Sequence, residues 1–176
     1  MSERSRGWSV WKGYSSEGDH PLGAYALLLM TFSSLFAALL GITRMRRRSL
    51  PARIAPADVA LLGVATYRLS RLLTKDSVTA VFRAPFTTFA RPTGNGEVEE
   101  KPRGTGIRHA LGELAVCPFC VGQWVAAFFT FGLVLAPRFT RLIAGLFSVY
   151  TVSDVLQLGY EAAKRRVLQM PEMPGD

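Results

Sequence analysis

The chain has 176 residues, enough for one domain of ordinary size, and its hydrophobic fraction of 49% and mean hydropathy of +0.19 are high for a soluble protein of that length. The net charge is +8 and the pI is near 10.1. Most Lys and Arg residues flank apolar segments, and no basic stripe with interleaved aromatic side chains is present, so we do not expect a nucleic-acid partner.

Residues 1–21 are a polar N-terminal tail, and residues 22–43 are uncharged. At about 1.5 Å per residue, a helix over the second segment crosses a hydrocarbon core of about 30 Å. A cleaved signal peptide is the alternative, but a polar tail precedes the segment, and arginines follow it where a cleavage site needs small residues. We therefore predict a retained transmembrane anchor.

Residues 44–56 form a basic juxtamembrane linker after the anchor. The linker begins with a run of arginines: Arg44, Arg46, Arg47 and Arg48. An anionic lipid surface attracts each such side chain by about 1 kcal/mol. Their position predicts contact with lipid headgroups, without recognition of one particular lipid.

Residues 57–73 predict a helix that is too short in its apolar part and too charged to span a membrane favourably. The uncharged run 59–67 is short and is followed by Arg68 and Arg71, so we expect an amphipathic or re-entrant helix. Residues 74–106 are rich in Gly and Pro and carry turn signals at Asn95-Gly96 and Pro102. We predict a loop there, on the membrane surface.

Two further apolar runs predict membrane spans at residues 115–136 and 142–160, joined by a short link as an antiparallel helical hairpin. Residues 163–176 follow as a C-terminal tail. The predicted fold class is all-α: an integral membrane helical bundle with three spans and one short helix.

The distribution of positive charge predicts the orientation, because Lys and Arg concentrate on the cytoplasmic side of a membrane. With three spans, the N-terminus outside, and residues 44–114 and the C-terminus inside, 16 of the 21 positive residues are cytoplasmic. If residues 58–73 also cross, the N-terminus is inside and the split is 14 to 7. The count favours three spans in a multi-pass protein of the cell membrane.

The two cysteines of the chain, Cys117 and Cys120, stand in CPFC at the start of an apolar run. The proline after Cys117 suits a first helical turn, and a helix N-terminus favours thiolate. A zinc site needs four ligands, so His109 would have to join the thiols, or two protomers would have to share the site. Packing residues, a redox pair and a metal site remain open, and Gly122 and Trp124 favour packing.

Polar residues recur every three or four positions in the last predicted span, and they include Asp154. A carboxylate at mid-membrane costs a few kcal/mol unless it is paired, so this stripe should face protein. Arginines of the short helix are the expected partners. We predict an intramembrane polar seam that holds the helices together, with a proton or solute path as the alternative; its members are Arg68, Arg71, Thr151, Asp154 and Gln157.

Four stretches of the chain resemble a known family: ATYRLSRLLTKD (65–76), RAPF (83–86), GEVEEKPRGTG (96–106) and GELAVCPFCVGQW (112–124). They are similar to the bacterial membrane family called domain of unknown function 1360 (DUF1360), over about residues 57–162. The most specific element is the CxxCxGxW pattern. Some members of that family are linked with sporulation, and the resemblance implies a membrane location without implying an activity. The Arg- and Ala-rich composition is typical of actinobacterial proteins.

No nucleophile with its base, phosphate loop or carboxylate dyad stands out, so we expect no catalysis. The leading hypothesis is a structural or scaffolding protein without a cofactor, which binds membrane lipid and either another membrane protein or a second copy of itself. The rival hypothesis is a membrane thiol protein that uses Cys117 and Cys120 for redox exchange or for zinc, with His109 as a further ligand.

Overall fold

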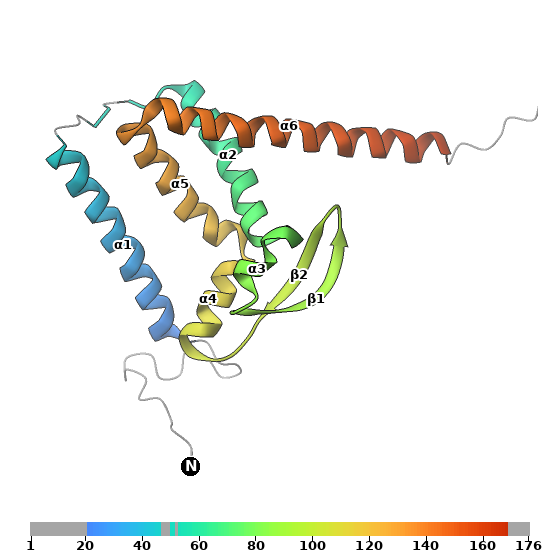
Figure 1. Cartoon of the computed structure of the whole chain (residues 1–176), viewed down its shortest axis with the longest axis horizontal. Coiled ribbons are helices and arrows are strands. Elements are labelled where there is room, and N and C mark those ends of the chain that lie inside the picture. The colour runs from blue at the N-terminus through green and yellow to red at the C-terminus, as the bar shows by residue number, and fades with distance from the viewer. Residues whose placement is uncertain (1–20, 47–49, 52, 169–176) are drawn as a thin grey trace, which may run out of the picture.

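The computed structural model, which describes residues 21–46, 50–51 and 53–168, is largely helical with one small sheet. Figure 1 shows α1, α5 and α2 in a row, with α6 starting beside the end of α5, running across α2 and continuing beyond it. The elements in chain order are α1 (Leu22–Met45), α2 (Pro56–Thr74), the 3-10 helix η2 (Ser77–Thr79), α3 (Ala80–Arg83), β1 (Thr87–Gly94), β2 (Glu97–Pro102), α4 (Gly106–Val116), α5 (Pro118–Leu135) and α6 (Pro137–Leu168).

The structure is mostly helical, as predicted, but the segment 74–106, predicted as a loop, contains an antiparallel β-hairpin, so the fold is not all-α. β1 pairs with β2 from Thr87 opposite Pro102 to Gly94 opposite Glu97. The turn residues Asn95 and Gly96 have φ values of 52° and 78°, the positive pair that a tight two-residue hairpin turn requires. Because β1 is exposed at every position after its first, the strand has no alternation of apolar and polar residues to reveal it.

Among the described residues, three helices are long and apolar enough to cross a membrane: α1, α5 and α6, whose most apolar stretches have a mean hydropathy of 2.0, 1.7 and 1.4. The run predicted as one span, 115–136, is divided at Cys117, whose φ of −101° and ψ of 105° are extended. Pro118 causes this break, since a proline disfavours the helical conformation of the residue before it. The last helix is longer than the predicted span 142–160 and starts at Pro137.

The apolar core lies where α2, α5 and α6 meet. Phe129 of α5, Ala65 of α2 and Ala144 of α6 are fully buried and belong to one cluster. Leu62 and Val125 complete this cluster. α2 is therefore the central helix of the bundle, although it is less apolar than its neighbours.

α1 and α5 run in the same direction. Near the start of α1, Tyr25 contacts Glu113 of α4; further along, the ring centroids of Phe32 and Trp124 are 5.0 Å apart. Aromatic contacts between the two helices continue toward their ends. The starts of α1 and α5 thus lie at the same end of the bundle (Figure 1). The predicted three-span topology needs these starts on opposite sides of a membrane, and the arrangement of the described helices does not match it.

Candidate functional site

The two thiols lie at the junction of α4 and α5. Cys117 occupies the N-cap of α5, and its Sγ accepts a hydrogen bond from the backbone N–H of Cys120 at 3.2 Å. This contact satisfies one of the donors that the first turn of a helix leaves without a partner. Both cysteines are free, and their side chains are close enough to interact. Cys117 therefore caps α5, and the two thiols are close enough to take part in the same reaction.

A cavity of about 530 Å³ opens beside the thiols, between α1, α4 and α5. Its size is within the range of small-molecule sites. Phe32 of α1 and Trp124 of α5 form part of a largely apolar wall, and both cysteines line the cavity. Its other polar lining residues are Tyr25, Glu113 and Gln123. Apolar walls with a few convergent polar groups make this cavity the candidate site.

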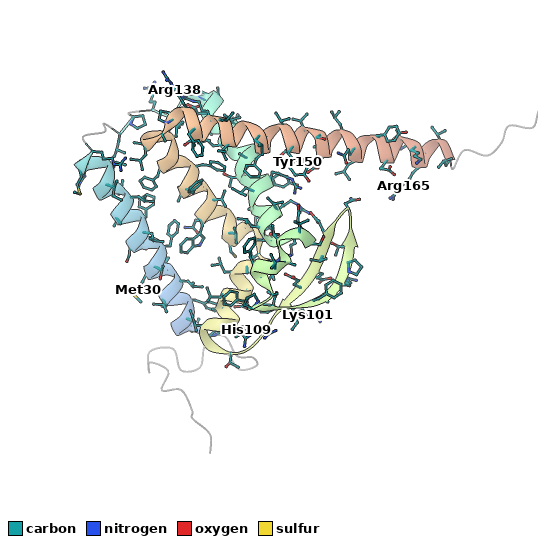
Figure 2. All side chains as sticks on the ribbon, viewed as in Figure 1. Met30, Lys101, His109, Arg138, Tyr150 and Arg165 are labelled. Carbon is teal, nitrogen blue, oxygen red and sulfur yellow. The ribbon has the colours of Figure 1, made fainter. Side chains whose placement is uncertain are left out.

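His109 does not join the thiols. It faces Glu113, one turn further along α4, with 3.6 Å between Nε2 and Oε1, and Glu113 also accepts the hydroxyl hydrogen bond of Tyr25. Figure 2 shows His109 on α4, near the start of α1. Within the described part of the chain, no three His, Cys, Asp or Glu side chains come together as metal ligands. A zinc site within one chain has no support from this geometry.

The structure brings two of the predicted seam residues together, Arg68 and Asp154. Arg68 Nε lies 3.0 Å from Asp154 Oδ2, and its guanidinium carbon lies 4.1 Å above the ring of Tyr150. The guanidinium also donates to Asp76 at 3.1 Å. Among the buried side-chain nitrogen and oxygen atoms of the described residues, only Nε of Arg68 lacks a hydrogen bond, so its contact with Asp154 is a charge contact.

The other predicted seam residues have different partners. Arg71 makes a bidentate pair with Glu97 of the hairpin, with two distances of 2.6 Å. Thr151 donates to the backbone carbonyl of Phe147 within α6. Gln157 is exposed and donates to a serine of its own helix. The seam is therefore shorter than predicted and continues toward the hairpin rather than along α6.

The sequence reasoning missed a buried charged pair beneath the hairpin. Arg83 Nε lies 2.5 Å from Glu100 Oε2, and their side chains are 3% and 5% exposed. Arg83 also donates to the backbone carbonyls of Leu73 and Asp76. Arg83 lies in RAPF and Glu100 lies in GEVEEKPRGTG, two of the stretches that carry the family resemblance. Because the segment was predicted to be a loop, neither charge was assigned a partner. An outer pair contrasts with it: the hydrogen bond from Arg91 lowers the pKa of the exposed Glu99.

The arginines predicted to contact lipid lie at the end of α1. Arg44 and Arg46 are exposed. Arg47 and Arg48 lie outside the described residues. Arg44 and Arg46 are therefore accessible to an anionic membrane surface at the end of α1, which is compatible with the predicted contact with lipid headgroups.

Residues 61–160 match the family described as "Protein of unknown function (DUF1360)". A curated relative, "Sporulation protein YjcA" of Bacillus subtilis (strain 168), is 29% identical over 102 residues, which cover 56% of this chain and 86% of the relative. No solved structure matches. The matched region includes most of α2, the hairpin, the thiols and most of α6, and it excludes α1.

Proposed function

Since the chain belongs to the DUF1360 family, we propose that it is a small integral membrane protein that acts as a scaffold and binds a second copy of itself through α6. The name of the Bacillus relative suggests sporulation as the process that uses the scaffold. The observation that carries the proposal is an apolar stripe on the outer face of α6.

The stripe follows the spacing of helix-to-helix packing. From Val155 to the last described residue of the helix, Leu168, every residue of α6 is exposed, and Figures 1 and 2 show this part of the helix, with Arg165 near its end, standing apart from the bundle. Alternating steps of four and three residues place one helix face against another. The stripe consists of Val149, Ser153, Leu156, Tyr160, Ala163 and Val167.

A second copy fits the stripe because the stripe is symmetric about position 158. In an antiparallel pair, Leu156 would face Tyr160, and Ser153 would face Ala163, with valines at both ends. The small residues allow two helices to approach closely. A two-fold interface uses the same surface on both subunits, which this symmetry supports.

Replacing Leu156 with Glu is expected to convert a dimer in detergent to a monomer, as measured by light scattering after size exclusion. Leu158→Glu is the matched control, since Leu158 is also exposed (56%, against 68% for Leu156) but lies off the stripe. It should leave the dimer intact. A monomeric wild-type protein, or equal loss of the dimer in both variants, would contradict the proposed interface.

We further infer that α1, α2 and α5 cross the membrane. Two successive spans that run in the same direction need a return crossing between them, and α2, at 19 residues and about 28 Å, is the only described helix between α1 and α5 of that length. Its charged residues are all paired: Asp58 with Arg141, Arg68 with two aspartates, and Arg71 with Glu97. Paired charges are tolerated in a span.

In this topology the start of α1 and the hairpin are cytoplasmic. Eleven positive residues lie at this end, three before α1 and eight from Arg68 to Arg108. Ten lie at the other end, seven in residues 44–53 and 138–141 and three at 164–166, so the charge count favours the hairpin end as the inner end by one residue.

Labelling of single cysteines in intact spheroplasts tests the crossing of α2. In a background with both native cysteines replaced by serine, Leu50→Cys should react with an impermeant maleimide and Thr93→Cys should not. The three-span alternative protects both positions. Protection of Leu50→Cys that disappears on lysis would therefore refute the crossing, without bearing on the α6 interface.

A further inference from the structure

The cavity between α1, α4 and α5 and the pair Cys117 and Cys120 take no part in the α6 interface. We propose that this cavity binds a quinone of the membrane and that the two thiols reduce it to the quinol. This activity goes beyond the scaffold function and uses a different surface of the protein.

The position and walls of the cavity indicate a ligand that comes from the membrane. The cavity is open on one side and lies between α1 and α5, two helices apolar enough to be surrounded by lipid chains. Leu28, Leu29 and Phe32 supply its α1 wall. A molecule with a long apolar chain can enter there without leaving the hydrocarbon layer.

The polar lining selects a neutral head. Among the described residues that line the cavity, none is Lys, Arg or His, and Glu113 is a carboxylate, so a phosphate-bearing lipid head would meet a like charge. A quinone ring is neutral and presents carbonyl oxygens that accept hydrogen bonds. The Gln123 side chain can donate to such a carbonyl. Trp124 offers a flat aromatic surface for the ring.

The two thiols can carry out a redox reaction, which the binding of an ordinary lipid would not require. Both line the cavity, and they are close enough to interact with each other. Oxidation of the dithiol forms one Cys117–Cys120 disulfide and releases two electrons and two protons. The quinone accepts the two electrons and the two protons, and its two carbonyl groups become the hydroxyl groups of the quinol. A further turnover requires a dithiol reductant to reopen the disulfide by thiol exchange.

The full-length, reduced protein in detergent, mixed with decylubiquinone without oxygen, tests the proposal. One quinol should form for every two thiols lost, as followed by quinone absorbance and by counting thiols with a maleimide. Cys120→Ser should abolish the reaction. Leu29→Trp, which fills the cavity, should slow it by about tenfold or more while both thiols remain titratable. Leu27→Trp, on the same helix but outside the lining, should react at the wild-type rate.

Three results would overturn the proposal: thiols that stay reduced in the presence of the quinone, a wild-type rate in Leu29→Trp, or purified protein with stoichiometric zinc on its thiols. A wild-type rate in the filled variant would mean that the thiols react outside the cavity. Unchanged thermal unfolding of each variant shows that the fold is retained. The dimer measurement on the same samples reports on the scaffold function independently.

Discussion

Replacing Arg83 with Ala is expected to lower the free energy of unfolding of the detergent-solubilised protein by about 3–5 kcal/mol, as measured by denaturant titration. The substitution leaves the buried carboxylate of Glu100 without its counter-charge. It also removes donors from the backbone carbonyls of Leu73 and Asp76. An uncompensated buried charge costs far more than a lost surface contact.

Arg91→Ala is the matched control, because Arg91 also pairs with a glutamate of β2 at 2.5 Å, but in an exposed position. Solvent and salt screen that pair, so little or no change is expected. If the two substitutions lower the stability equally, the hairpin is not held to α3 by a buried pair. Replacing Arg83 and Glu100 together by apolar residues should recover much of the loss.

Gly112→Ala is expected to cost about 1–3 kcal/mol, measured in the same way, because α4 has no room for a methyl group at this position. A Cβ atom there would lie 2.5 Å from the backbone oxygen of Phe86 and 3.0 Å from Cβ of Pro102. Neither neighbour is the end of a flexible side chain, so α4 must move away from the hairpin. The thiols at the end of α4 would shift with it.

Gly63→Ala is the control for Gly112→Ala, since Gly63 lies inside α2 with no atom within 4 Å of the added methyl group. There the substitution should stabilise the helix by about 0.5–1 kcal/mol, because alanine loses less backbone entropy than glycine. A loss at both positions would show that helix stability, and not the contact with the hairpin, controls the outcome at Gly112.

The hairpin shows where sequence reasoning failed and why. Asn95-Gly96 was recognised as a turn, but β1 carries Arg91 and Pro92 at exposed positions, and β2 carries four charged residues, so neither strand shows an alternation of apolar and polar residues. What decides the strands is the neighbouring α2, whose Arg71 pairs with Glu97, while Arg83 pairs with Glu100. Pairing between residues so far apart in the chain has no local signal.

The candidate site was predicted in part. The spacing of Cys117 and Cys120 and the proline between them were enough to expect a helix start. The cavity was not predictable, because one of its walls is α1, which lies almost ninety residues away in the chain. Asp154 was expected to need a charged partner, and the structure assigns it Arg68 and leaves Arg71 to the hairpin.

Sequence alone determined the number of long apolar helices and the helix start at Pro118, because these follow from hydrophobic run length and from proline sterics. It did not determine their limits, since the predicted span 115–136 is divided at Cys117 and α6 starts at Pro137. Only the tertiary structure decided that α1 and α5 run in the same direction, that arginines of α2 bind both the hairpin and α6, and that two thiols border a cavity. The physical reason is the distance along the chain over which each effect acts. Run length and backbone sterics act between neighbours in the chain, whereas helix direction and charge pairing depend on which distant surfaces meet.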